Sequence, residues 1–388
     1  MITGLAPAAA AEGCPIASAP PPAVDTSEVP KPGAASPEPL PVPETPVGGA
    51  ALGRCGSVAP PAADPPAQVS APSWVLADLD SGEVLAAREP HARHRPASTI
   101  KILTALAAIR ELRMDDAVVA TQADADQEGS KVGLVPGVTY TVHQVLTGLI
   151  MQSGNDAAHA LTAKVGGPRA MLGSMNRIAR ELGALDTRAA TPSGLDGPGM
   201  STSAYDLALV FRAAMADPTF AAAAATERAE LPGPAGQPPR PVSSDNTLLL
   251  NYPGAIGAKS GFTDDARHTF VGAAQRDGRR LVAVLVHGEN QPIRQPKQVA
   301  RLLDYGFGLG PVRPAGHLVE RPRPRAADAP APPPQPAPLP NRADPHPPRS
   351  SAIAVPVAIL AVTVAIVLGV LTGRRRRAAS TRNDERRE

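Results

Sequence analysis

The chain has 388 residues and a net charge of only +2, from 38 basic and 36 acidic side chains. This small charge argues against a nucleic-acid partner, which needs a concentrated basic surface. The 47 prolines gather mainly in two blocks, one near each end of the chain. Because proline fixes φ and removes a backbone donor, these blocks predict extended segments. One central body, residues 72–310, remains between them.

The N-terminal residues indicate export. Residues 1–11 end in small side chains of the A-x-A type, and we interpret them as the end of a signal peptide whose start lies upstream. Residues 12–71 follow as a proline-rich segment that we expect to be disordered. In an oxidising compartment Cys14 and Cys55 are expected to pair. Cys14 also partly fits a lipoprotein box, so lipid attachment there is the alternative.

The C-terminal residues indicate a membrane anchor. Residues 351–373 carry no charge, and as a helix they would reach roughly 34 Å, enough to cross a bilayer. Four arginines open the tail 374–388, so the positive-inside rule predicts a cytoplasmic C-terminus and an outside body. A proline-rich linker at 311–350 joins the two. The prediction is a single-pass plasma-membrane protein with the lipid bilayer as a partner; a buried core helix is the alternative.

The body contains strands at both ends and helices in the middle. Two strands joined by an Asp-Ser-Gly turn open it, and a helix with apolar residues at helical spacing follows from Pro96. A later helix has its N-cap signal at Ser201 or Thr202. Three strand-like runs and a closing helix complete the body. This order predicts an α+β fold, a mixed antiparallel sheet flanked by helices.

Ser98 and Lys101 form the first candidate catalytic pair. They lie three residues apart at the start of a predicted helix and so share one face. A serine hydroxyl needs a base to become a nucleophile, and lysine can serve if burial or nearby cations lower its pKa. Arginine cannot, because it stays protonated. The alternative interpretation is a capping serine beside a solvated lysine.

Ser153 and Asn155 form the second candidate element, in the turn of "QSGNDAA" between two helical patterns. The alternative is an ordinary turn, since the same triplet spacing recurs at Ser174 and at Ser244. The triplet at Ser174 lies inside an amphipathic helix. The triplet at Ser244 is too close in sequence to the third element to form a separate wall of a cleft.

Lys259, Ser260 and Gly261 form the third candidate element, on a predicted strand. A cation beside a hydroxyl can bind a carboxylate, and the glycine lets a ligand approach the backbone. The alternative is an edge strand protected by its lysine. Each element is weak alone, but the ordered set S-x-x-K, S-x-N and K-[ST]-G is specific.

With these motifs the chain resembles the low-molecular-mass penicillin-binding proteins, the D-alanyl-D-alanine carboxypeptidases of the serine β-lactamase-like superfamily. The stretches "ASTIK", "SGNDAA", "TPSGLDGPGMSTSAYDLALV" and "GAKSGFTDDARHT" carry the resemblance, which covers residues 72 to 310. It implies a mixed sheet with helices on both sides, and an active cleft at their junction. It also implies a bacterial plasma membrane as the location.

The resemblance further implies roles for individual residues. Ser98 would be acylated by a peptidoglycan stem pentapeptide, Lys101 would activate it, and Ser153 would relay a proton to the leaving D-alanine. Asn155 would orient the substrate amide. The remaining implied substrate-binding residues are Lys259, Ser260 and Gly261, Phe262 through its backbone N–H in the oxyanion hole with that of Ser98, and Arg294 as a carboxylate ligand.

The chain departs from the family at two points. Serine at position 260 replaces the usual threonine and keeps the hydroxyl. No all-β domain follows the catalytic part, so anchoring is expected to rest on the membrane span. β-Lactam antibiotics are expected to acylate Ser98 and inhibit the enzyme.

Three other functions remain open at the level of sequence. A β-lactamase of the same fold would need a deacylating glutamate, and Glu181, Glu227 and Glu230 lack the asparagine four residues on that such enzymes carry. A transpeptidase would differ only in whether an amine or water attacks the acyl-enzyme. A catalytically silent cell-wall-binding protein would have no need for both Ser98 and Lys101. No metal site and no cofactor are expected, because the histidines and cysteines form no ligand motif.

Overall fold

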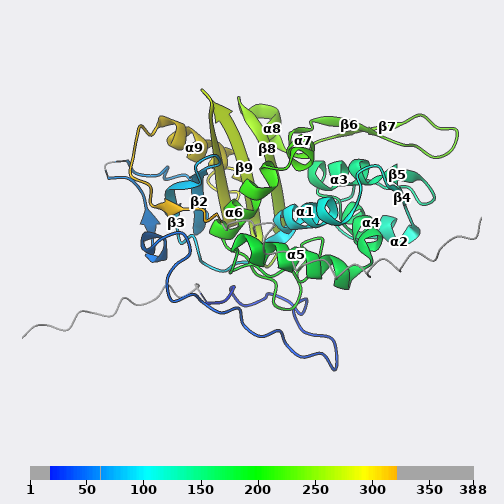
Figure 1. Cartoon of the computed structure of the whole chain (residues 1–388), viewed down its shortest axis with the longest axis horizontal. Coiled ribbons are helices and arrows are strands. Elements are labelled where there is room, and N and C mark those ends of the chain that lie inside the picture. Colours follow the sequence, from blue (N-terminus) through cyan, green and yellow to red (C-terminus); the bar gives the residue numbers. More distant parts are fainter. Residues whose placement is uncertain (1–17, 62, 321–388) are drawn as a thin grey trace, which may run out of the picture. The chain divides into compact units, whose positions relative to one another are not determined.

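The computed structural model describes residues 18–61 and 63–320 (Figure 1). In this part of the chain a seven-stranded sheet has helices packed against it, together with two small two-stranded sheets. The predicted α+β fold is therefore confirmed. The segments predicted at 1–11, 351–373 and 374–388, and most of the linker, lie outside the described residues.

The main sheet has the strand order β1-β3-β2-β10-β9-β8, with β11 pairing to β3. The strands are β1 (Ser57–Val58), β2 (Ser73–Asp78), β3 (Glu83–Arg88), β8 (Ala255–Thr263), β9 (Arg267–Arg276), β10 (Arg279–Gly288) and β11 (Gly316–His317). Every pairing is antiparallel, so the expectation of a mixed sheet is wrong. Short turns join β2 to β3 and β8 to β9 to β10, and such turns permit only antiparallel pairs. Strand β8 ends the sheet with a free edge in the described structure.

Strands β1 and β11 lie outside the predicted body of residues 72–310. Ser57 pairs with Arg88, and Gly316 pairs with Val84, so both short strands extend the sheet through β3. Two-residue strands contain too few positions for an alternating pattern, which is why the sequence did not indicate them.

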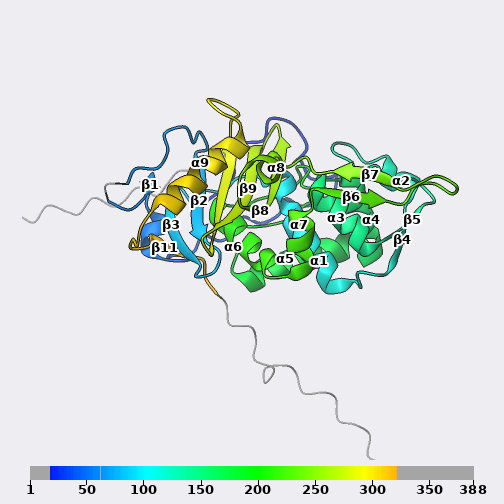
Figure 2. The same cartoon turned by 90° about the horizontal axis from the view of Figure 1, so that it is seen from above.

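Side chains of the central strands alternate between two hydrophobic cores. Trp74 and Leu76 belong to one core and Val75 and Ala77 to the other, as the two-residue period of a strand requires. Helix α9 (Gln295–Gly308) packs against β9 and β10 over the first core. The short helix α8 (Thr247–Asn251) lies on the same side, with Leu248 in this core, and the larger helices gather on the opposite face (Figure 2).

The large helical layer consists of α1 (Lys101–Glu111), α3 (Val142–Met151), α4 (Asn155–Val165), α5 (Pro168–Leu182), α6 (Ala204–Met215) and α7 (Pro218–Ala225). Smaller elements are η1 (Ala50–Gly53), η2 (Ala97–Ile100), α2 (Gln122–Ala125), α8 (Thr247–Asn251), β4 (Ala117–Val119), β5 (Thr139–Thr141), β6 (Arg228–Leu231) and β7 (Arg240–Ser243). Helix α1 contacts α3, α4, α5 and α6, and its first eight residues are all buried. Its position at the centre of this layer fixes the segment that precedes it.

Helix α6 begins later than its sequence signal suggested. Ser201 and Thr202 form isolated bridges with Arg188 and His94, so their backbone is extended. Ser203 is the N-cap instead, and its side chain accepts a hydrogen bond from the backbone N–H of Asp206.

No helix within residues 18–61 and 63–320 is by itself long and apolar enough to cross a bilayer. Helices α6 and α7 reach that length and hydropathy only as a pair, and they are bent by 105° relative to each other. The predicted membrane span lies elsewhere in the chain.

Residues 18–47, which we call the strap, follow an extended path along the body in the blue part of Figure 1. The buried Arg93 donates to the carbonyl oxygens of Ser18, Leu40 and Pro41 at 2.6 to 2.8 Å. Extended proline-rich backbone has no internal hydrogen bonds, so its carbonyls are free to accept from arginine. The prediction of disorder over 12–71 is therefore wrong for the strap.

Candidate active site

Ser98 lies in the tight turn η2, immediately before α1. The preceding residue, Ala97, has φ of 46°, a left-handed conformation that is uncommon for a residue with a side chain. The turn is enclosed, because a Cβ on Gly194 would lie 2.0 Å from the Ala97 carbonyl oxygen and a Cβ on Gly261 would lie 2.7 Å from the Ser98 nitrogen. Two glycines thus allow neighbouring chain segments to close around the serine.

The amine of Lys101 contacts three oxygen atoms. Its Nζ lies 2.8 Å from Ser98 Oγ and 2.7 Å from Asn155 Oδ1, and it also bonds the Ser193 carbonyl oxygen. A neutral amine has two N–H groups and one lone pair. A charged ammonium would donate to all three oxygens, whereas a neutral amine would donate to the two carbonyl-type oxygens and could accept from the Ser98 hydroxyl with its lone pair.

The environment of Lys101 favours this neutral form. The side chain is fully buried, and burial lowers its pKa well below the usual value of 10.5. The nearby positive charge of Lys259 lowers the pKa further, while the carboxylate of Asp156 opposes the shift. The lowered pKa of Lys101 agrees with its predicted role as the base that takes the proton of Ser98.

Ser153 and Lys259 form a second lysine–serine pair. Lys259 donates from Nζ to Ser153 Oγ at 2.8 Å and to the Ser260 carbonyl oxygen at 2.7 Å. Ser153 stands between α3 and α4 with φ of 56°, which turns its side chain toward β8. Burial lowers the pKa of Lys259 to about 8, and Asp245 partly offsets this effect. Lys259 therefore keeps most of its charge at neutral pH.

Asn155 is held by the loop that precedes α3. Its Nδ2 donates to the Glu128 carbonyl oxygen at 2.6 Å, and its backbone N–H donates to the Ser130 carbonyl oxygen at 2.7 Å. The buried carboxylate of Asp156 fixes this loop by accepting the backbone N–H groups of Val132, Gly133 and Leu134. The Asn155 oxygen is thereby directed at Lys101.

Strand β8 forms the wall opposite Ser153. Because β8 is the last strand of the sheet, its outer backbone groups are available to an extended peptide. Gly261 lies against Ser98, and a Cβ at that position would also come within 2.5 Å of Thr269 Oγ1. The strand can approach the serine only because position 261 has no side chain.

Phe262 and Arg294 lie beyond this contact. The Phe262 ring is 49% exposed and its centroid lies 4.6 Å from that of His268. Asn290 hydrogen-bonds His268, and the backbone of Gln295 donates to Asn290. This chain of contacts links the segment around Arg294 to the far end of β8. Arg294 itself is the exposed N-cap residue of α9, and its predicted role as a carboxylate ligand stays a prediction.

The structure adds two residues that sequence reasoning did not assign to the site. Ser193 contributes its carbonyl oxygen to Lys101, and Gly194 packs on the Ala97–Ser98 peptide. Both belong to "TPSGLDGPG", a stretch that carried the family resemblance without a role. Ser193 acts through its backbone carbonyl, which leaves no signal in the side-chain sequence. Only the Ser-Gly dipeptide could have indicated that this loop belongs to the site.

The alternative S-x-N triplets have local structural roles. Asn176 pairs with the backbone of Ala189 from within α5, and Asn246 caps α8. Only the triplet at Ser153 reaches the two lysines. The three glutamates considered for deacylation are exposed: Glu181 pairs with Arg110 on the surface, and Glu227 and Glu230 lie at β6.

Within the described ranges one group of potential metal ligands occurs. Oxygen atoms of Glu28, Asp196 and Asp265 lie within 4.8 Å of one another, and Arg95 forms an ion pair with Glu28. The expected pairing of Cys14 with Cys55 involves residue 14, which lies outside the described residues, and stays a prediction.

The fold and site together define an acyl-transfer enzyme with a serine nucleophile. A hydroxyl 2.8 Å from a buried lysine with a lowered pKa, a second serine beside another lysine, and a strand edge can supply a nucleophile, a proton path and a peptide-binding wall. This is the arrangement of the penicillin-binding proteins and serine β-lactamases.

Comparison with known proteins narrows the class. Residues 59–290 match the family described as D-alanyl-D-alanine carboxypeptidase. The D-alanyl-D-alanine carboxypeptidase DacB2 of Mycobacterium tuberculosis is 48% identical over 268 residues, which cover 68% of this chain and 89% of that protein. The carboxypeptidase DacF of Bacillus subtilis is 32% identical over 61% of this chain and 62% of its own length.

Solved structures agree with this assignment. A crystal structure of D-alanyl-D-alanine carboxypeptidase from Mycobacterium tuberculosis aligns with a TM-score of 0.64 and 46% identity, covering 67% of this chain and 99% of its own. The Streptomyces K15 DD-transpeptidase aligns with a TM-score of 0.60 and 27% identity, covering 63% and 100%. The chain belongs to the D-alanyl-D-alanine carboxypeptidase family. It is a serine peptidase, and both a peptidoglycan substrate and β-lactam binding fit this family.

Proposed function

We propose that Ser98 is the residue acylated when the terminal D-alanine is removed from a stem pentapeptide. Neutral Lys101 takes the hydroxyl proton across the 2.8 Å contact, and Ser98 Oγ attacks the carbonyl carbon of the penultimate D-alanine. The negative oxygen that develops is stabilised by the backbone N–H groups of Ser98 and Phe262. The observation that carries this proposal is the 2.8 Å contact between Ser98 Oγ and the amine of Lys101, which is fully buried and has a lowered pKa.

The second half of the reaction returns the proton and releases both products. Ser153 passes a proton to the leaving amine nitrogen, and Lys259 stabilises the Ser153 oxygen through its 2.8 Å hydrogen bond. D-Alanine departs and leaves an ester on Ser98. Ser153 takes the proton that Lys101 had accepted from Ser98, so Lys101 becomes neutral again. Lys101 then deprotonates a water molecule that attacks the ester, and it passes this proton to the Ser98 oxygen as the ester bond breaks.

Substrate binding uses the edge of β8. The stem peptide pairs with this strand as an added antiparallel segment, and Asn155 binds its amide group. Lys259 and Ser260 bind the terminal carboxylate, with Arg294 as a further cationic ligand. Because a carboxylate is recognised at the end of the strand, the terminal residue of the peptide is the one removed.

The test combines two measurements on the purified full-length protein. Intact mass after incubation with penicillin is expected to rise by one antibiotic molecule in the wild type and to stay unchanged in Ser98→Ala. The wild type is also expected to release D-alanine from a stem pentapeptide. An adduct that persists in Ser98→Ala would overturn the assignment of the nucleophile.

The choice of acyl acceptor follows from the same assay. Adding an amino acceptor such as glycine to the pentapeptide reaction distinguishes two outcomes. Hydrolysis gives the free tetrapeptide, whereas transpeptidation joins the tetrapeptide to the acceptor through a new peptide bond. We expect hydrolysis to predominate, as the carboxypeptidase relatives suggest. A predominant amide product would instead favour transpeptidation, the activity named for the K15 structure.

We also propose a single-pass location in the plasma membrane of a bacterium, with the catalytic part outside. The support is the uncharged run 351–373 followed by four arginines. A protease added to intact protoplasts is expected to remove the catalytic part and to leave the tail 374–388 intact. Protection of the catalytic part would contradict this topology.

A further inference from the structure

The strap contacts the chain segment that leads to the nucleophile. The Nε and Nη2 atoms of Arg95 both donate to the carboxylate of Glu28, which makes a bidentate ion pair. The Nη1 atom of Arg95 donates to the Pro21 carbonyl oxygen at 2.7 Å. Arg95 is only 2% exposed, so the strap supplies nearly all the partners of a buried guanidinium. Arg95 stands three residues before Ser98.

The intervening turn is strained and depends on outside support. The Pro96 carbonyl oxygen accepts from Thr269 at 2.8 Å and from Thr99 at 2.6 Å, and Ala97 holds its left-handed φ of 46°. A conformation of this kind costs free energy and persists only where neighbours over-determine it. The Arg95 anchor is one of these neighbours.

The strap also contacts the segment that follows β8. The Val24 backbone N–H donates to Asp265, which lies in the turn three residues after Phe262. Asp196, in the loop that contains Gly194, faces this turn, with a carboxylate oxygen within 4.8 Å of one on Asp265. The same short piece of strap therefore bonds both segments that carry the proposed oxyanion-hole donors.

We propose that Val24 and Glu28 of the strap clamp the oxyanion hole, with Glu28 as a positioning residue for Ser98. The two N–H donors belong to separate segments, η2 and β8, whose spacing sets the strength of oxyanion binding. Glu28 fixes the first segment through Arg95, and Val24 fixes the second through Asp265. This inference rests on the proposed function, since it concerns the hole in which Ser98 reacts.

The charges around Glu28 make a selective test feasible. Glu28, Asp196 and Asp265 face one another within 4.8 Å, and burial and the other two carboxylates raise the pKa of Asp196. Replacing Glu28 by glutamine loses the ion pair with Arg95 but relieves repulsion among the carboxylates. The change therefore disturbs the position of Arg95 more than the stability of the whole body.

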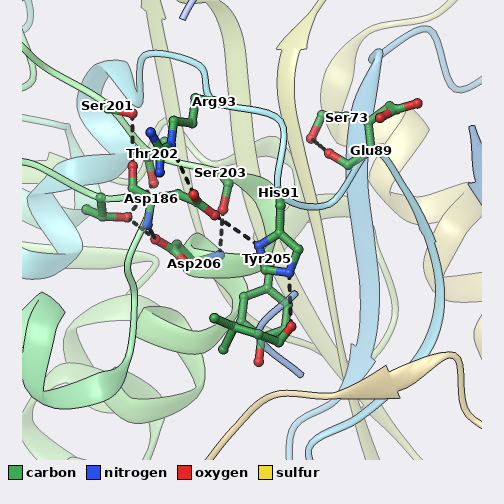
Figure 3. Close-up of polar contacts among 12 residues, drawn as sticks. Ser73, Glu89, His91, Arg93, Asp186, Ser201, Thr202, Ser203, Tyr205 and Asp206 are labelled. Atoms are coloured by element: carbon green, nitrogen blue, oxygen red, sulfur yellow. Dashed lines mark hydrogen bonds and ion pairs between the residues drawn. The ribbon is translucent and has the colours of Figure 1, made fainter. Parts of the chain in front are cut away.

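A second anchor keeps the strap attached in such a variant. Arg93 binds strap carbonyls and the carboxylate of Asp186, which is also bonded to His91, as Figure 3 shows for the pairs with Asp186. The Nε2 atom of His91 contacts the Val47 carbonyl oxygen at 3.0 Å. Glu28→Gln thus loosens the middle of the strap, while Arg93 still binds Ser18, Leu40 and Pro41.

The experiment measures acylation of the full-length protein by a fluorescent penicillin at several concentrations. Such data separate the dissociation constant of the first complex from the rate constant of acylation. For Glu28→Gln we expect the rate constant to fall about tenfold or more, because small misplacements of reacting groups have large effects. The dissociation constant should change less than twofold. Glu38→Gln, in the same strap with an exposed side chain, should behave as the wild type.

Val24→Pro provides an independent variant, because proline removes the N–H that bonds Asp265. It is expected to lower the acylation rate constant in the same way. Wild-type rate constants in both variants would overturn the clamp, provided that the wild type itself is acylated at Ser98. Loss of folded protein in both variants would also overturn it, because the strap would then support the fold. Failure of the wild type to be acylated would instead refute the proposed function.

Discussion

Lys101 and Lys259 occupy neighbouring buried positions but differ in their expected charge. Burial and the charge of Lys259 lower the pKa of Lys101 well below 10.5, while Lys259 has a pKa of about 8. Lys101 has two carbonyl-type partners and one hydroxyl, which suits a neutral amine. Two lysines of the same type thus have different protonation states because one reduces the pKa of the other.

This difference predicts a bell-shaped pH dependence for acylation. The rate should rise with pH as Lys101 loses its proton and should fall again as Lys259 loses its own near pH 8. Acylation rate constants measured with a penicillin from roughly pH 5 to pH 10 test this profile. A rate that keeps rising through pH 9 would show that the charge of Lys259 is not needed.

Lys101→Arg tests the requirement for a base directly. Arginine keeps a positive charge but does not lose its proton, so we expect acylation to slow by about 10² to 10⁴ fold. Lys297→Arg, on the exposed surface of α9, is the matched control and should leave the rate unchanged. Near-normal acylation in Lys101→Arg would place the base elsewhere.

Lys259 also has a predicted cost for stability. Its folded-state pKa of about 8 lies below the usual 10.5, so the folded protein binds this proton more weakly than the unfolded chain does. The lowered pKa corresponds to about 3 kcal/mol of destabilisation at neutral pH, which is relieved as pH rises from 8 toward 10.5.

Lys259→Met should therefore be at least as stable as the wild type at pH 7 while losing most acylation activity. Its advantage in thermal unfolding should shrink by pH 10, because the wild-type lysine is then neutral in the folded state. A variant that is much less stable at pH 7 would show that the hydrogen bonds of Lys259 outweigh the cost of its burial.

At the scale of elements, the site depends on how closely β8 approaches η2. Gly261→Ala would place a methyl group 2.5 Å from Thr269 Oγ1 and 2.7 Å from the Ser98 nitrogen, so the strand must move away from the serine. We expect acylation to fall by about tenfold or more, since the oxyanion donors separate. Penicillin acylation rates of the folded variant provide the measurement.

Gly173→Ala is the control for that change. It makes the same substitution in α5, where an added Cβ meets nothing within 4 Å. Alanine favours helix over glycine by roughly 1 kcal/mol, so this variant should be slightly more stable and fully active. Equal loss of activity in both variants would argue against a special role for Gly261.

Elements with a strong periodic pattern were predictable. The pairs β2–β3 and β8–β9–β10 and helix α9 appear where alternation and helical spacing indicated. Helix α1 was also expected, but its nearly complete burial was not, because it depends on the helices α3 to α7 that pack around it. The short strands β1 and β11 and the start of α6 at Ser203 depend on pairing partners distant in sequence.

At the scale of the whole molecule, the described residues belong to one compact unit. A chain that stops at Glu320 should therefore be acylated by penicillin, and should release D-alanine from the pentapeptide, at the wild-type rates. It should also appear in the soluble fraction, whereas the full chain sediments with membranes if residues 351–373 span the bilayer. Equal distribution of both forms between the fractions would contradict membrane anchoring by the C-terminal segment.

The residue types and their spacing were enough to predict the chemistry and its order along the chain. Ser98, Lys101, Ser153, Asn155 and Lys259 could be chosen because catalysis needs those residue types at fixed spacings. The lowered pKa of Lys101 could not be predicted in this way, since burial and the approach of Lys259 bring together segments over a hundred residues apart. The same holds for the strap: its composition predicts no regular structure, and buried arginines of the body give it a defined path. The composition of a segment describes that segment alone, whereas its conformation in the folded protein also depends on the residues that it contacts.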